Sequence, residues 1–160
     1  MFKLENYISC QPLPMTGIMG CYRKINSYFC HYMSAKFPKK ERLKSKKIID
    51  RLFLEGNTLM RFPLKLIYLK TPLSANTKVQ VAVAVPKRSF GKAVTRNRIK
   101  RLMRESYRLN KAPVFNNLEG SFAFLFLYIG KEMPTFKEVE RSMLALFKQF
   151  ILHKNDDESK

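Results

Sequence analysis

The stretch KVQVAVAVPKRSFGKAVTRNRIKRLMRESYRLNK, residues 78–111, changes its periodicity halfway along. Over residues 79–85 valine alternates with glutamine or alanine, which is the two-residue period of a strand. Pro86 interrupts that pattern, and from Val94 onward the uncharged residues return at helical spacing. The stretch therefore predicts a strand followed by a helix that ends near residue 110.

The predicted helix has two distinct faces. Measured from Val94 at about 100° per residue, the arc from about 60° to 180° is uncharged; it holds Leu109, Leu102, Thr95, Ser106, Ile99 and Met103. The arc from about 200° to 340° is basic; it holds Arg96, Lys100, Arg104, Arg108 and Arg101, and Arg98 lies beyond its far edge, near 40°. We therefore expect the helix to pack on a core by one side and to present cations on the other.

Cations in this region have almost no acidic counterparts. Glu105 is the single acid between residues 87 and 111, among Lys87, Arg88, Lys92, Arg96, Arg98, Lys100, Arg101, Arg104, Arg108 and Lys111. A solvated helix surface usually mixes the two signs, because oppositely charged residues four apart stabilise a helix. Arg96 and Arg98 also lie in the early turns, where the helix dipole disfavours cations. The pattern favours a binding face for a polyanion over a solvated surface.

The flanking sequence predicts the remaining elements. SKKIIDRLFLEG (45–56) reads as a helix that Ser45 caps and that Gly56 ends in a left-handed conformation. Residues 63–70 read as a strand joined to 78–85 by a hairpin-length connection, and 121–129 as a strand buried on both faces. Thr135 and Glu138 form a capping box before a closing amphipathic helix. The order helix, strand, strand, helix, strand, helix indicates a mixed α+β domain.

Composition sets the limits of the domain. The 160 residues carry a formal charge of +19, nearly all of it within residues 37–154. We expect residues 37–152 to form the domain, 153–160 to be an acidic tail, and 1–36 to be a disordered extension or to precede a true start at Met33. Cys10, Cys21 and Cys30 all lie in residues 1–36, at separations that do not fit a zinc site. They indicate the reduced thiols of a cytoplasmic protein.

Three further observations limit the partners and the chemistry that are possible for this protein. No apolar run approaches the roughly 20 residues that cross a bilayer, so we expect a nucleic acid rather than a membrane as the polyanion. Folded RNA fits better than DNA, because nothing pairs with the basic helix as in a helix-turn-helix motif. The domain's acids are scattered, and no histidine precedes His153 within it, so no catalytic residue or metal site is expected in the protein.

The segment KAVTRNRIKRLMRESYR, residues 92–108, resembles the protein subunit of bacterial ribonuclease P. The matching positions are an Ala-Val pair, an Arg-Asn-Arg triplet, a Lys-Arg pair and an Arg-Glu pair: Ala93, Val94, Arg96, Asn97, Arg98, Lys100, Arg101, Arg104 and Glu105. The resemblance extends over residues 37–152. It covers the opening helix at 37–56, the strand VAVAVPKR at 81–88, and the last strand and helix at 121–151.

This resemblance implies a fold and a division of labour. The fold would be a small α/β sandwich with a left-handed β-α-β crossover. The protein would be the accessory subunit of an endoribonuclease, binding ribonuclease P RNA and precursor tRNA, with no protein or membrane partner. The RNA subunit would hydrolyse the phosphodiester that releases the 5′ leader, using Mg²⁺ held by RNA and substrate. The place of action would be the cytoplasm.

The resemblance also assigns residues to the two RNA partners. Ribonuclease P RNA would be bound by Lys87, Arg88, Lys92, Arg96, Asn97, Arg98, Lys100, Arg101, Arg104 and Arg108. The leader would lie in a cleft between the first helix and the sheet, at Ile49, Phe53 and Tyr68. A small basic ribosomal or other structural RNA-binding protein would share the charge and size, but it would not depend on a leader. A protein-only nuclease is disfavoured by the scattered carboxylates.

Overall fold

The computed structural model describes residues 37–73, 77–112, 114 and 118–158, with side chains as far as Lys154. The expectations for residues 1–36, including the three cysteines, lie outside this part of the chain. The elements in chain order are η1 (Lys39–Glu41), α2 (Lys46–Glu55), β1 (Asn57–Arg61), β2 (Leu64–Lys70), β3 (Val79–Ala84), α3 (Ala93–Asn110), β4 (Phe122–Tyr128) and α5 (Phe136–Glu158). The mixed α+β class is confirmed.

Four strands form one mixed sheet in the order β1-β2-β4-β3. β1 and β4 are both antiparallel to β2, whereas β3 is parallel to β4, with Val81 opposite Phe124. The helix α3 connects β3 to β4 and completes a β-α-β unit, whose left-handed sense stays a prediction. The expected hairpin between β2 and β3 is wrong, because β4 lies between them; the hairpin joins β1 to β2 instead. β1 was not predicted, since its five residues bury only Leu59.

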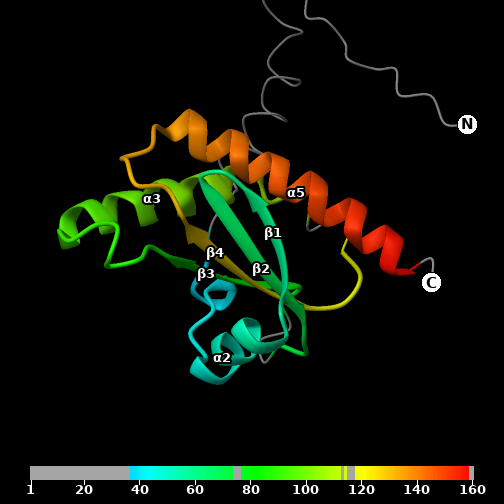
Figure 1. The fold of residues 1–160 in the computed structure, drawn as a ribbon. Coiled ribbons are helices and arrows are strands. Elements are labelled where there is room, and N and C mark those ends of the chain that lie inside the picture. The colour runs from blue at the N-terminus through cyan, green and yellow to red at the C-terminus, as the bar shows by residue number, and fades with distance from the viewer. Residues whose placement is uncertain (1–36, 74–76, 113, 115–117, 159–160) are drawn as a thin grey trace, which may run out of the picture. The chain divides into compact units, whose positions relative to one another are not determined.

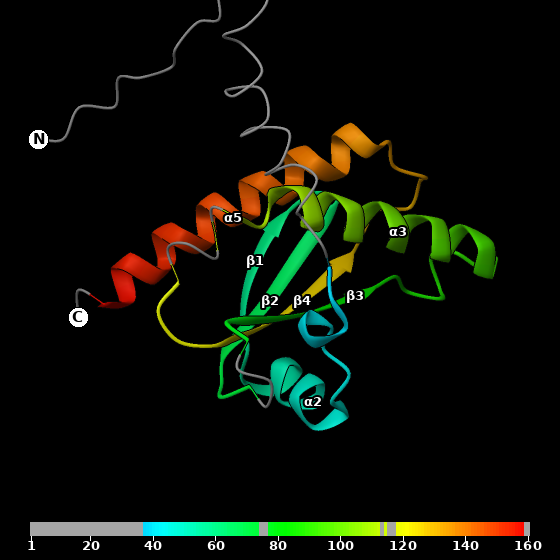
Figure 2. The same cartoon turned by 180° about the vertical axis from the view of Figure 1, so that it is seen from behind.

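Helices cover both faces of the sheet, with α3 and α5 on one face and α2 on the other (Figures 1 and 2). Alternate residues of β2 divide between the faces: Leu66 and Tyr68 join the core under α3 and α5, and Ile67 joins the core under α2. The two-sided burial explains why the sequence of β4 is apolar throughout. No helix in the described part of the chain is long and apolar enough to cross a membrane.

Tyr107 lies at the centre of the core beneath α3 and is 1% exposed. Its ring meets Phe37 edge-on at 5.4 Å between centroids and lies 6.2 Å from Phe126. On the helical wheel Tyr107 falls near 220°, inside the arc expected to be basic. The buried face of α3 is therefore turned from the expected one: Ile99, Met103, Ser106 and Tyr107 are buried, whereas Leu102 and Leu109 are half-buried.

The capping predictions for α2 and α5 have different outcomes. The capping box of α5 is confirmed: the Thr135 N–H donates to Glu138 Oε2 at 2.8 Å, and the Glu138 N–H donates to Thr135 Oγ1 at 3.4 Å. Together these contacts hold the pKa of Glu138 below its usual value, the backbone donor contributing most. Ser45 stands at the N-cap of α2 but makes no side-chain capping bond. α5 also extends to Glu158, beyond the predicted domain end at 152.

Gly56 ends α2 for a reason other than the predicted one. Its φ of −75° is not left-handed, so that prediction is wrong. A Cβ at this position would overlap the Leu52 carbonyl oxygen and would lie 2.7 Å from Ile67 Cγ2. Glycine is therefore required because a side chain would meet the backbone of the last turn of α2 and the Ile67 side chain of β2.

This packing predicts that Gly56→Ala destabilises the fold. We expect the free energy of unfolding to fall by about 1–3 kcal/mol, because the added methyl group meets backbone and a buried side chain. Gly91→Ala is the matched control, since a Cβ there has nothing within 4 Å and the free energy should change little. Urea unfolding of the two variants measures both effects. Equal stabilities would contradict the close approach of α2 to β2.

Candidate nucleic-acid interface

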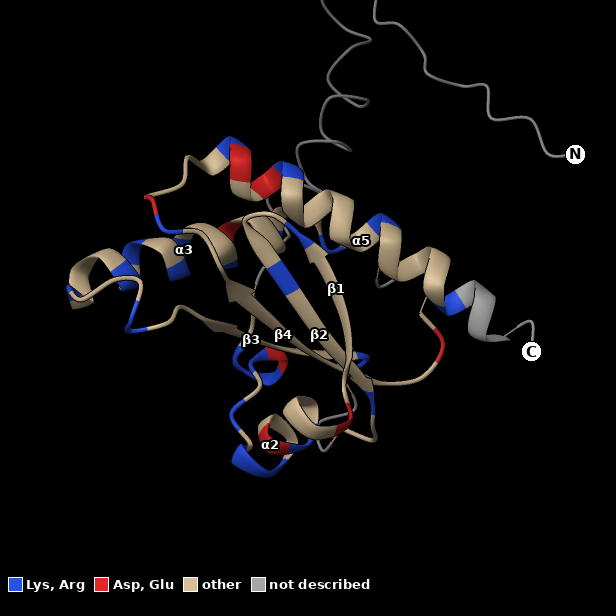
Figure 3. Ribbon diagram, in the orientation of Figure 1, with Lys and Arg blue, Asp and Glu red and all other residues tan. Residues whose placement is uncertain are grey.

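The open side of α3 and the loop before it carry the predicted cations. Lys87, Arg88 and Lys92 are exposed in the loop, and Asn97 is exposed on the helix beside exposed Arg98, Arg101 and Arg104. Figure 3 shows Lys and Arg recurring along α3 and in the segment before α2, whereas the strands are largely uncharged. The structure thus brings most of the predicted RNA-binding residues onto one helix and its leading loop.

Seven of these cations have no carboxylate partner within the described residues. They are Lys87, Arg88, Lys92, Arg98, Lys100, Arg101 and Arg104. Burial, together with the positive charges of Arg42 and Arg101, lowers the pKa of Arg104. Like charges held this close repel each other, and an anion placed among them would relieve that repulsion.

Three of the ten cations between residues 87 and 111 are engaged within the protein. Arg96 donates from Nη1 to the carbonyl oxygens of Phe90 at 2.7 Å and Gly91 at 2.6 Å, so it fixes the loop that enters α3. Lys111 donates to both carboxylate oxygens of Glu41 at 2.7 Å, and both side chains are mostly buried. Arg108 pairs with Glu105, with Nε 2.9 Å from Oε2. Arg96 and Arg108 therefore use part of their hydrogen-bonding capacity within the protein.

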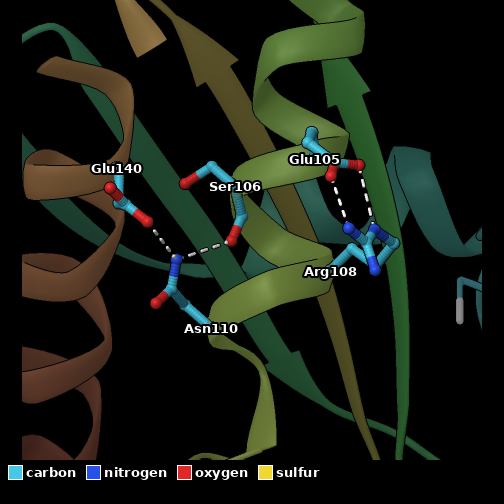
Figure 4. A network of polar contacts seen from close by, with 5 residues as sticks. All are labelled: Glu105, Ser106, Arg108, Asn110 and Glu140. Carbon is cyan, nitrogen blue, oxygen red and sulfur yellow. Dashed lines mark hydrogen bonds and ion pairs between the residues drawn. The ribbon is translucent and has the colours of Figure 1, made fainter. Parts of the chain in front are cut away.

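Polar contacts near the end of α3 fix which side of the helix stays open. Asn110 Nδ2 donates to the Ser106 carbonyl oxygen at 2.9 Å and to Glu140 Oε1 of α5 at 3.2 Å. Figure 4 shows Glu140 and Asn110 on one side of α3 and the Glu105–Arg108 pair on the other. One side therefore binds α5, and the opposite side is available to a partner.

Residues 37–43, the entry segment, lie along part of the arc expected to be open. The Leu43 N–H donates to the Val81 carbonyl oxygen at 3.0 Å, and Arg42 pairs with Val81 as an isolated parallel bridge. Phe37 covers Tyr107, and Glu41 binds Lys111. The expectation that the whole basic arc faces outward is therefore wrong for its edge nearest Tyr107, because the entry segment covers that edge.

A hollow of about 480 Å³ lies where the entry segment meets α3. Five arginines line it: Arg42, Arg98, Arg101, Arg104 and Arg108. Phe37 and Leu102 supply its apolar wall, and Glu105 is the one acid among the described residues that line it. We call this feature the arginine hollow. Arg42 and Phe37 were missed as site residues, because the basic run at residues 39–47 does not reveal that it packs beside α3.

The three residues assigned to the leader cleft do not lie together. Ile49 and Phe53 are one turn apart on α2; Ile49 is half-buried against the sheet, and Phe53 is 59% exposed. Tyr68 is buried on the opposite face of the sheet, with its ring edge-on to Phe150 at 4.9 Å. Alternation along β2 explains the difference, because its neighbour Ile67 faces α2.

The small face of β3 is covered by protein. Ala82 and Ala84 are half-buried in the core under α2, and Gln80 donates from Nε2 to the Lys40 carbonyl oxygen at 3.3 Å. This face of β3 is therefore occupied by the protein itself.

Most of the domain's acids make structural contacts. Glu41, Glu55 and Glu105 pair with Lys111, Arg51 and Arg108. Glu138 caps α5, and Glu140 accepts from Asn110. Within the described ranges, no three His, Cys, Asp or Glu side chains are grouped so as to hold a metal ion.

Comparisons with known proteins agree on one family. The family model for ribonuclease P matches residues 37–151. The chain is 36% identical over 108 residues to the ribonuclease P protein component of Porphyromonas gingivalis, covering 66% of this chain and 79% of that protein. It is 35% identical over 121 residues to the component of Chlorobium phaeobacteroides, covering 68% and 83%.

Solved structures share the fold. The RNase P protein of Staphylococcus aureus gives a TM-score of 0.56 at 18% identity, over 68% of this chain and 93% of that one. The RNase P protein of Thermotoga maritima gives 0.54 at 25% identity, over 68% and 96%. The family match spans the sheet, α2, α3 with its basic surface, and α5 as far as residue 151. The chain belongs to the ribonuclease P protein family, whose members are the protein components of ribonuclease P.

Proposed function

We propose that this chain binds ribonuclease P RNA through the open side of α3 and the loop before it, and that it promotes removal of the 5′ leader from precursor tRNA in the cytoplasm. One observation carries the proposal: seven cations between residues 87 and 104 lack a carboxylate partner in the described structure, and most of them share one exposed surface. A phosphate chain supplies the counter-charge that the protein does not.

Arginines dominate the helical part of this surface, which suits RNA. Their guanidinium groups form two parallel hydrogen bonds to a phosphate and can also stack on bases. The buried side of α3 is fixed by Tyr107 and by the Asn110–Glu140 contact. The stretch of helix that carries Arg98, Arg101 and Arg104 is therefore fixed before RNA arrives, so less conformational freedom is lost on binding.

Phe53 is the residue we propose for contact with the leader. A phenylalanine with 59% of its surface exposed on a helix is available to stack on an unpaired base. Ile49, one turn earlier on the same side of α2, would flank the contact. Tyr68 is not part of this proposal, because it lies in the core on the other face of the sheet.

In this proposal the RNA subunit carries out the cleavage of the phosphodiester bond. Three glutamates already form ion pairs, a fourth caps α5 and a fifth accepts a hydrogen bond from Asn110, which suits side chains with a structural role. Mg²⁺ would be held by RNA and substrate, and the protein would screen the repulsion between the two polyanions. The protein would thus act as the accessory subunit of an endoribonuclease.

Replacing both Arg98 and Arg101 with alanine tests RNA binding. We expect weaker binding to a bacterial ribonuclease P RNA and a flatter dependence of log affinity on log salt, by roughly one unit for each lost phosphate contact. This pair is preferable to one including Arg96, whose loss would also free the Phe90–Gly91 loop. Filter binding across a salt series measures both quantities.

The matched control replaces Arg61 and Arg141, which are exposed on β1 and α5. It removes the same charge from surfaces away from the open side of α3. The affinity for RNA and its salt dependence should therefore change less than in the Arg98 and Arg101 variant. If the two double variants lost affinity and slope equally, the effect would be one of net charge, and the proposed interface would be wrong.

Replacing Phe53 with alanine tests the leader contact. Because only precursor tRNA has a leader, we expect the reconstituted holoenzyme to lose about five- to hundredfold in affinity for precursor tRNA and little for mature tRNA. Phe62→Ala, which removes another exposed phenylalanine from the β1–β2 turn, should leave both affinities nearly unchanged. Equal losses for precursor and mature tRNA would contradict a leader contact at Phe53.

A further inference from the structure

We propose that the arginine hollow is a subsite for one unpaired RNA nucleotide, with its phosphate between Arg42 and Arg104 and its base stacked on the Arg42 guanidinium above Phe37. This inference deepens the proposed function and rests on it. It adds to the RNA interface two residues, Phe37 and Arg42, that lie 56 and 51 residues before the start of α3 at Ala93.

The position of Arg42 is set by contacts of its two neighbours in the chain rather than by its own side chain. The Leu43 N–H is bound to the Val81 carbonyl oxygen, and Glu41 on the other side of Arg42 is bound to Lys111. These two contacts anchor the entry segment on β3 and at the end of α3. Arg42 is therefore held against α3 even though the arginines already there repel it.

Among the described residues, no carboxylate pairs with Arg42, Arg98, Arg101 or Arg104. Glu105 is the one acid that lines the hollow, and Arg108 occupies both of its carboxylate oxygens. Burial and the neighbouring charges of Arg42 and Arg101 lower the pKa of Arg104, as expected for a cation that lacks a counter-ion. A phosphate placed between Arg42 and Arg104 would complete the site electrostatically.

The aromatic and concave parts of the hollow indicate a base as well as a phosphate. The Arg42 guanidinium carbon lies 5.3 Å from the centre of the Phe37 ring, which is itself held edge-on by Tyr107. An arginine oriented on an aromatic ring offers its outer face to a base. The volume of about 480 Å³ lies within the range of about 300–1,000 Å³ for small-molecule sites, and Leu102 adds an apolar wall. A surface that bound phosphates alone would need neither an arginine placed on an aromatic ring nor a hollow with an apolar wall.

Titration of the full chain with three small probes tests the subsite. Adenosine 5′-monophosphate, ribose 5-phosphate and inorganic phosphate are added separately, and NMR follows the Phe37 ring and the Arg42 Nε–H signals. We expect adenosine monophosphate to shift both signals and to bind roughly five- to hundredfold more tightly than ribose 5-phosphate, because the base stacks. Equal binding of the two, or no shift at either residue, would overturn the proposal.

Variants of Arg42 separate stacking from charge. In Arg42→Lys the charge remains, so the salt dependence of binding to ribonuclease P RNA should be unchanged, while the preference for adenosine monophosphate over ribose 5-phosphate should disappear. Arg61→Lys is the control and should alter neither. If Arg42→Lys kept the preference, no base would stack there, and the proposal would fail. The proposed function has a separate readout, the salt dependence of the Arg98 and Arg101 double variant.

Discussion

The rest of this structure depends on how α3 packs: one side of the helix is buried in the core, and on the other side Arg98, Arg101 and Arg104 have no carboxylate partner among the described residues. Tyr107 anchors the helix in a core of aromatic rings, and Asn110 ties its end to α5. These contacts hold Arg98, Arg101 and Arg104 close together despite their mutual repulsion. Because the fold rather than a counter-ion holds them in place, the surface is ready to bind a polyanion.

The sheet determines where each surface can lie. β4 is central, with β2 antiparallel on one side and β3 parallel on the other, and its two faces receive different helices. Alternation along the strands therefore separates the residues that support α3 from those that support α2. The proposed leader contact at Phe53 and the proposed RNA surface of α3 belong to opposite layers, so one small domain can present two surfaces to RNA.

Much of this arrangement was predictable from periodicity. The change from a two-residue to a helical period at Pro86 located β3 and α3, and Thr135 with Glu138 marked the start of α5. Contacts distant in sequence were not predictable. Nothing local indicates that Glu41 meets Lys111, that Phe37 covers Tyr107, or that β4 separates β2 from β3. Position in the family motif likewise grouped Tyr68 with Ile49 and Phe53, although strand alternation turns Tyr68 toward α5.

Reconstitution tests the central claim most directly. The full chain is added to a bacterial ribonuclease P RNA at a Mg²⁺ concentration too low for the RNA to cleave efficiently alone, and release of the 5′ leader from precursor tRNA is followed. If the cations of α3 lie along the RNA, leader removal should rise sharply with added protein and saturate at a fixed ratio. No stimulation, with an RNA that is active alone at high Mg²⁺, would contradict the account.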